Sequence, residues 1–199
     1  MELTLYYRGE LGSNKGPNQK QGLRRAFHKQ LSVLWQQDPW QGERWRWDTE
    51  DKIYQVHKDS KNLENVDIKH TIGKFTFVPL ISRKIFMVAD INIQMLRSEP
   101  AGTVSAQSGD LDNRVKTLLD ALRMPNTPQD LPKDDIPRDN ETPFFCLLED
   151  DALIHKFSVT THRWLDATVS PKEVMLLISI RTSLTKLMAH NEHLGGNVI

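Results

Sequence analysis

The clearest helix in the sequence is the stretch DLDNRVKTLLDAL at residues 110–122. Its apolar residues recur three or four positions apart, at Leu111, Val115, Leu118, Leu119 and Leu122. This spacing places them along one side of a helix, which predicts that this side packs against an apolar core. The helix begins among acidic and amide side chains, which are favoured there because the first backbone N–H groups have no partner within the helix.

Strands are expected on both sides of this helix, in segments that alternate or are rich in β-branched and aromatic residues. They cover residues 2–7, 75–81, 85–96, 153–164 and 173–181. Since only three residues separate 75–81 from 85–96, these two segments are expected to pair as a β-hairpin. A second helix is expected over 19–37, where apolar residues recur at helical spacing before Pro39.

The residues between these segments are polar or rich in glycine, proline and acidic side chains. We expect irregular structure over 38–70, a flap or disordered loop over 124–143, and a flexible tail after about residue 187. With 199 residues and 38% hydrophobic content, the chain has enough apolar side chains for one core. The expected fold is therefore α/β, a single compact domain over 1–199 in which helices flank a mixed β-sheet.

The cysteine content and the hydropathy pattern bear on where the protein works. Cys146 is the only cysteine, which excludes an intramolecular disulfide and a cysteine-based zinc site. No apolar run approaches the roughly 18 residues that a membrane-spanning helix needs. We therefore expect a soluble, cytoplasmic protein.

The charge of the chain limits the kinds of partner that it binds. The formal net charge is zero, which counts against a protein that grips nucleic acid through a large basic excess. The first thirty residues are basic, however, and four cations there are candidates for contact with DNA phosphates: Lys15, Lys20, Arg24 and Arg25. A solvated helix face is the alternative interpretation of these residues.

Carboxylates gather in two places, at Asp110 and Asp112 and again in the Glu-Asp-Asp stretch at 149–151. Capping is one interpretation, because aspartate is favoured at helix starts. The other is a metal site, because adjacent carboxylates repel unless a cation neutralises them, and Mg²⁺ binds hard oxygen ligands. Lys116 follows Asp112 by about one helical turn, so its ammonium can reach a phosphate or pair with Asp112 or Asp120.

These segments resemble the RusA Holliday junction resolvases. The matching residues are Asp110-Leu111-Asp112-Asn113 with Lys116, then Asp120-Ala121-Leu122, then Asp150-Asp151-Ala152, in the same order and with the same local spacing. The matched region runs from about Gly109 to Leu153. The resemblance implies a small homodimeric α/β nuclease that cuts four-way DNA junctions or other branched DNA with Mg²⁺, which Mn²⁺ can replace.

The same resemblance implies the site residues. Asp110, Asp112 and Asp151 correspond to the catalytic aspartates that bind the metal, and Lys116 corresponds to the catalytic lysine. Three further residues are supporting candidates: Asn113, Asp150 and Lys156. The chain departs from the family pattern over 124–143, where the family has a short turn containing glycine. We hypothesise that this acidic loop competes with DNA for the basic N-terminal residues.

A second interpretation comes from a different functional class. It is a non-catalytic DNA-binding or regulatory protein of a mobile element or an antiviral defence system, which keeps the RusA-like fold. The zero net charge and the acidic loop favour it. The retained carboxylates oppose it, because a protein that only binds DNA has no need of a cluster that repels phosphate. These residues do not distinguish RNA from DNA as the substrate.

Overall fold

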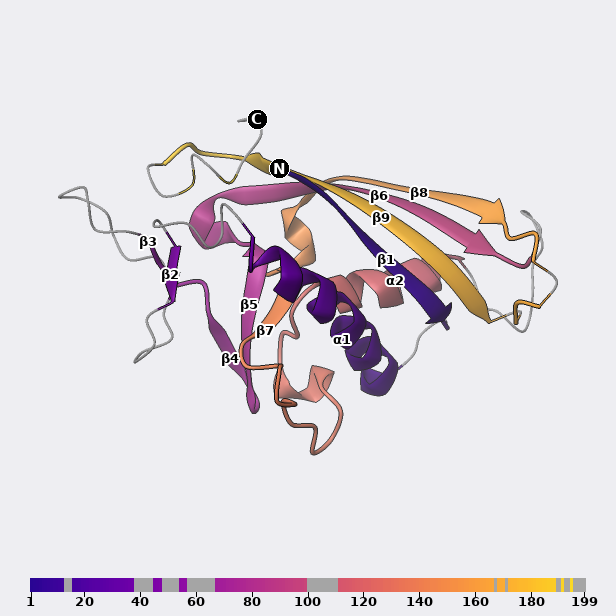
Figure 1. Ribbon diagram of the computed structural model, residues 1–199, viewed down its shortest axis with the longest axis horizontal. Helices are drawn as coiled ribbons and strands as arrows, with labels where there is room; N and C mark the ends of the chain where they lie inside the picture. The colour runs from indigo at the N-terminus through magenta and orange to yellow at the C-terminus, as the bar shows by residue number, and fades with distance from the viewer. Residues whose placement is uncertain are drawn as a thin grey trace.

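A four-stranded sheet with the strand order β1-β9-β6-β8 forms one main layer of the molecule (Figure 1). The computed structural model describes residues 1–12, 16–37, 45–47, 54–56, 67–99, 111–166, 168–170, 172–188, 191 and 194. The four strands are β1 (Glu2–Glu10), β6 (Met87–Arg97), β8 (Ile154–Arg163) and β9 (Glu173–Leu184). β9 pairs antiparallel with β1 and β6, whereas β8 runs parallel to β6. The sheet is therefore mixed, as the sequence predicted.

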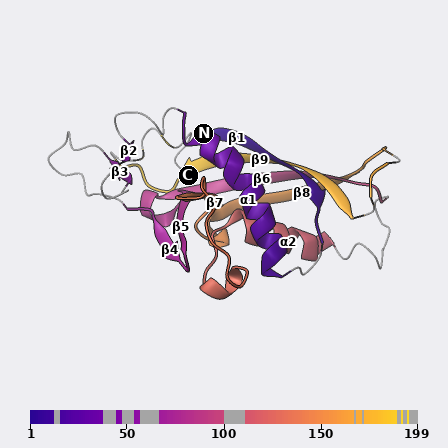
Figure 2. The same cartoon turned by 60° about the horizontal axis from the view of Figure 1, so that its bottom comes forward.

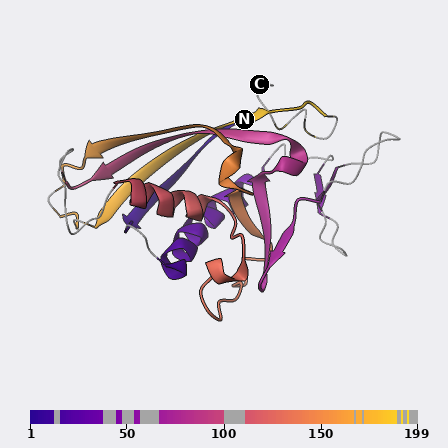
Figure 3. The same cartoon turned by 180° about the vertical axis from the view of Figure 1, so that it is seen from behind.

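Buried and exposed side chains alternate along the strands, so this sheet has one buried face and one open face. On β6, Ile91 and Ile93 are buried whereas Asn92 and Gln94 are exposed, because successive side chains of a strand point to opposite faces. Two helices cover the buried face, α1 (Pro17–Leu34) and α2 (Leu111–Leu122) (Figures 1 and 2). Neither of them lies over the opposite face, which is the open face (Figure 3).

Each helix buries one apolar side against this sheet and against the other helix. α1 buries Leu23, Phe27 and Leu31, and α2 buries Leu118 and Leu122. Removing one such side chain from water stabilises the fold by about 1.5–3 kcal/mol. The predicted helix at 110–122 is confirmed over its described residues. The other helix begins at 17 and ends at 34 instead of spanning 19–37, because residues 35–37 turn away from the helical path.

A second, smaller sheet lies beside the first (Figure 1). It joins β4 (His70–Ile72), β5 (Phe75–Ile81) and β7 (Phe144–Leu148), with β5 antiparallel to β4 and parallel to β7. A two-stranded ribbon joins β2 (Trp45–Trp47) to β3 (Tyr54–Val56). Parts of the segment at 38–70 are therefore strands, where the sequence predicted irregular structure.

The predicted hairpin between 75–81 and 85–96 is wrong. The two strands belong to different sheets, and a short 3₁₀ helix, η1 (Arg83–Ile85), turns the chain from one sheet to the other. Phe86 follows it with a φ of 55°, in the left-handed region that favours glycine. β5 pairs instead with β7, all of whose residues are buried, so a partner distant in the sequence replaces the local one.

The loop at 124–143 contains more regular structure than expected, and two described residues of the C-terminal tail are buried. The loop contains the 3₁₀ helix η2 (Pro128–Asp130), which carries a capping box from Thr127 to Asp130. In the tail, Asn191 and Leu194 are fully buried, and the Asn191 amide donates to the Ile85 carbonyl at 2.9 Å. Among the described helices, none is long and apolar enough to cross a membrane.

Candidate functional site

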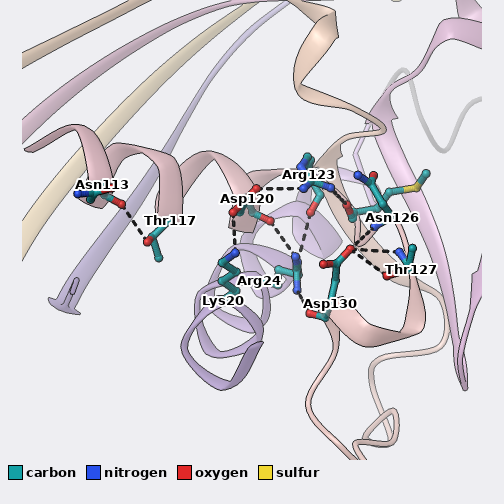
Figure 4. Close-up of polar contacts among 10 residues, drawn as sticks. Lys20, Arg24, Asn113, Thr117, Asp120, Arg123, Asn126, Thr127 and Asp130 are labelled. Atoms are coloured by element: carbon teal, nitrogen blue, oxygen red, sulfur yellow. Dashed lines mark hydrogen bonds and ion pairs between the residues drawn. The ribbon is translucent and has the colours of Figure 1, made fainter. Parts of the chain in front are cut away.

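The first two turns of α2 carry part of the predicted site. The side chains of Asp112 and Lys116 are exposed there, and neither makes a hydrogen bond or ion pair within the described part of the chain. Arg114 lies between them in the sequence and is buried. Asn113 is half-buried, and its backbone carbonyl accepts from the Thr117 hydroxyl at 3.0 Å (Figure 4). Asp110, the second predicted carboxylate here, lies outside the described residues.

The second group of carboxylates forms a turn at the end of β7. Glu149 accepts hydrogen bonds from the Ser82 hydroxyl at 2.5 Å and from the Arg83 N–H at 3.0 Å. Asp150 accepts from the Ala152 N–H at 2.8 Å, and so caps the 3₁₀ helix η3 (Asp151–Leu153). The Asp151 side chain is exposed and makes no such bond among the described residues. Asp151 is therefore the carboxylate of this turn that local structure leaves available.

Asp112 and Asp151 lie towards opposite ends of α2. The backbone N–H of Met124, just past the helix, donates to Leu148 at 2.9 Å, which holds the end of α2 beside the end of β7. Leu122 lies ten positions after Asp112, so the helix axis advances by about 15 Å between them, at about 1.5 Å per residue. Two views place η3 near the C-terminal end of α2 and away from its start (Figures 1 and 3).

A single metal ion therefore does not join Asp112 and Asp151 within one chain of this structure. Protein oxygen ligands lie about 2.0–2.1 Å from Mg²⁺, so two carboxylates that share an ion approach within a few ångströms. Among the described residues, no three His, Cys, Asp or Glu side chains form a group suited to a metal ion. Of the three predicted aspartates, the structure places only Asp112 at the start of α2, and Asp110 lies outside the described residues.

Asp120 is part of an ion-pair network between the helices, drawn in Figure 4. Its carboxylate lies 2.6 Å from the Lys20 ammonium and 3.0 Å from the Arg123 guanidinium. Burial raises the pKa of Asp120, but these two cations outweigh it and hold the pKa below its ordinary value. Asp120 thus pairs with Lys20 and not with Lys116. The Lys20 ammonium is already bound by a carboxylate of its own chain.

Arg24 is buried against the end of α2 and the loop at 124–143. Its guanidinium donates to the backbone carbonyls of Asp120 at 2.8 Å, Asp130 at 3.3 Å and Arg123 at 3.3 Å (Figure 4). Burial lowers its pKa to about 10, still far above neutral pH, so the group remains charged. These contacts give Arg24 a role in holding two segments together, whereas the sequence suggested contact with phosphate.

Arg25, the next residue of α1, holds the acidic loop. Its guanidinium forms a two-pronged contact with Glu141, at 2.8 and 3.1 Å, and a third bond with Asp135 at 3.0 Å. Burial raises the pKa of Glu141, but hydrogen bonds from Arg25 and the Arg138 N–H outweigh it, and the net shift is downward. Lys15, the remaining predicted phosphate contact, lies outside the described residues.

His28 completes the attachment of the loop, and nothing in the local sequence pointed to it. Its Nδ1 accepts from the Phe145 N–H at 2.9 Å, which leaves a proton on Nε2 to donate to the Asn140 carbonyl at 2.8 Å. The ring stacks on Phe144 with a centroid distance of 4.5 Å. Burial lowers the pKa of His28, so the neutral ring is favoured. Arg24, Arg25 and His28 together fix the loop on α1.

Lys156 lies on the open face of the large sheet. It lines a hollow of about 640 Å³ together with Asp90 and Arg181. At this end of β8 the register shifts between Ala89 and Asp90, and His155 contacts Asp90 at 3.0 Å. Since α2 covers the other face, the supporting role predicted for Lys156 does not place it beside Asp112.

The chain was compared with protein families, curated proteins and solved structures, and no relative was found. The functional argument therefore rests on the residues and their arrangement.

Proposed function

We propose that the chain is a metal-dependent endodeoxyribonuclease that hydrolyses phosphodiester bonds in branched DNA, with four-way junctions as its main substrate. The observation that carries this proposal is the start of α2, where Asp112 and Lys116 are exposed and unpaired among the described residues. Every other segment of α2 is engaged in packing or ion pairs. The resemblance of residues 110–122 to RusA resolvases gives these two side chains their assigned roles.

Each residue has a role that its chemistry supports. Asp112, with Asp110, supplies hard oxygen ligands for Mg²⁺ or Mn²⁺, and such an ion when bound lowers the pKa of a water that attacks the phosphodiester. Lys116 stands about one turn further along α2, where its ammonium stabilises negative charge on a phosphate oxygen. The positive end of the helix dipole adds to the attraction for phosphate. A homodimer is part of the proposal, because symmetric cutting of a junction needs two sites.

The proposal is tested by Asp112→Asn, which keeps the shape of the side chain and removes its charge. We expect cleavage of a synthetic four-way junction in Mg²⁺ to fall by about a hundredfold or more, since most of the chemistry depends on the ion. Asp139→Asn is the matched control, because Asp139 is an exposed aspartate of the loop at 124–143. Junction cleavage by Asp112→Asn at the rate of the unaltered chain rejects the proposal.

The separation of Asp112 from Asp151 favours a second candidate function. A protein that keeps the RusA-like arrangement without assembling three aspartates would bind or regulate DNA and not cut it. The two candidates differ in one measurement on the unaltered chain, incubated with a labelled junction in Mn²⁺. Cleavage products favour the nuclease, whereas a retarded complex with the junction intact favours the binding protein.

A further inference from the structure

The open face of the large sheet carries its side chains in rows that cross the four strands. The first row, which we call the charged rung, holds Glu2, Arg181, Asp90 and Lys156 in the order β1, β9, β6 and β8. The register pairs Glu2 with Arg181, Arg181 with Asp90, and Asp90 with Lys156. The charges therefore alternate across the sheet as negative, positive, negative and positive. All four residues line the hollow of about 640 Å³.

The next row accounts for the hollow beside the charged rung. This second row holds Thr4, Ser179, Asn92 and Ser158, whose short polar side chains form its floor. The side chains of Glu2 and Arg181 are 67% and 61% exposed and pair with each other at 2.6 Å across β1 and β9. Asp90 is 34% exposed and contacts His155 at 3.0 Å. A partner that faces this sheet therefore meets four alternating charges with room beside them for long side chains.

We propose that this face binds the same face of a second copy of the chain, about a twofold axis parallel to the strands. Such an axis reverses the strand order, so β1 faces β8 of the other copy and β9 faces β6. Read in the reversed strand order, the charges of the second copy run positive, negative, positive and negative. Every charge of the rung therefore faces an opposite charge. Glu2 then faces Lys156 of the other copy, and Arg181 faces Asp90. Packed sheets lie about 10 Å apart, within reach of these long side chains.

Other arrangements and partners match the charged rung less well. A twofold axis along the rung itself would place Glu2 against Glu2 and Arg181 against Arg181, which is repulsive. Nucleic acid would be repelled by Glu2 and Asp90 as strongly as it is attracted by the two cations. The proposed axis also places the start of α2 at the same end of both copies, because it leaves the strand direction unchanged (Figure 1).

The test uses two reversals of charge that the proposed geometry makes complementary. Lys156→Glu makes two pairs of carboxylates face each other across the dimer, and Glu2→Lys makes two pairs of ammonium groups do so. We expect each variant alone to sediment as a monomer at concentrations where the unaltered chain is a dimer. In an equal mixture of the two, each chain offers the charges that the other lacks. The mixture is therefore expected to regain the dimer, and an affinity tag on one variant recovers the other.

The control is Lys133→Glu, which makes the same change of charge at an exposed residue of the loop at 124–143. It is expected to remain a dimer. A monomeric unaltered chain, a dimeric Lys156→Glu variant, a monomeric control or a mixture that stays monomeric would each overturn the proposed interface. Thermal unfolding of every variant separates loss of the dimer from loss of the fold. Sedimentation measures the mass of the assembly, so its result does not depend on whether the chain cleaves DNA.

Discussion

Residues of α1 illustrate how a side chain's role depends on partners far away in the sequence. Arg24 and Arg25 are adjacent cations, yet Arg24 is 1% exposed and holds backbone carbonyls, whereas Arg25 pairs with two carboxylates of the loop. Those partners lie about a hundred residues further along the chain. A basic cluster in the sequence indicates charge on a helix, but it does not indicate whether DNA or the protein's own acidic groups neutralise that charge.

His28→Ala is expected to remove a stabilising contribution that depends on pH. At pH 7.5 the variant should lose about 2–4 kcal/mol of unfolding free energy, because it leaves a cavity and two polar groups without partners. Burial lowers the pKa of folded His28 below its ordinary 6.5, so its contribution is complete above that pH. It is lost as the pH falls from 6.5 through the folded pKa, because the unfolded chain takes up the proton first.

Chemical unfolding at several pH values between about 7.5 and 5 measures this effect. The unaltered chain should lose more stability than His28→Ala over that range, so the two curves converge towards acid. His162→Ala, at an exposed position of β8, serves as the control. A constant difference between His28→Ala and the unaltered chain at all pH values would show that the neutral ring is not favoured by folding.

Among the elements, the sequence predicted those whose signal is local. The apolar spacing in α2, the residue types in β8 and the alternation in β9 depend on neighbouring residues, and these elements lie where the sequence placed them. The pairing of β5 depends instead on β7, more than sixty residues away, and the hairpin prediction failed for that reason. The same limit applies to the turn at 149–151, since Ser82 fixes the Glu149 carboxylate from another part of the chain.

The variant Glu141→Gln is expected to weaken the attachment of the loop at 124–143 to α1, because Arg25 of α1 binds the Glu141 carboxylate. This change removes a charged partner of Arg25, and the loss should be about 1–3 kcal/mol of unfolding free energy at pH 7. Folding lowers the pKa of Glu141 below its ordinary 4.5, so the stabilisation is complete above that pH and is lost as the pH falls through the folded pKa. The variant and the unaltered chain should therefore converge in acid, as measured by urea unfolding.

The same variant tests whether the acidic loop competes with DNA for α1. Releasing Arg25 from Glu141 should strengthen binding of a four-way junction at low salt and steepen its salt dependence, because one more cation reaches phosphate. Asp139→Asn removes a charge from the same loop without removing a bond of Arg25, and it should bind like the unaltered chain. Equal junction affinity in all three proteins would exclude competition at Arg25.

At the scale of the whole molecule, the sequence predicted a set of candidate site residues but not the distance between Asp112 and Asp151. Local spacing places Asp112 one turn from Lys116, and the structure retains that arrangement on α2. Order along the chain says nothing about the gap between Asp112 and Asp151, which depends on the direction of α2 and on the bond from Met124 to Leu148. The buried core and the mixed sheet followed from composition and alternation, whereas this separation required the complete topology.

On the proposed function, Asp112 binds a metal ion that Asp151 does not share, and Mn²⁺ titration calorimetry on two variants tests this. Asp112→Asn should weaken Mn²⁺ binding by about tenfold or more, because a site with few carboxylates loses a charged ligand. Asp151→Asn should bind Mn²⁺ like the unaltered chain, because Asp151 lies beyond the C-terminal end of α2, whose axis is about 15 Å long from Asp112 to Leu122. An equal loss in both variants would mean that the two carboxylates share one ion. Since one chain does not bring them together, such a result would require a rearranged fold or an Asp151 contributed by a second copy.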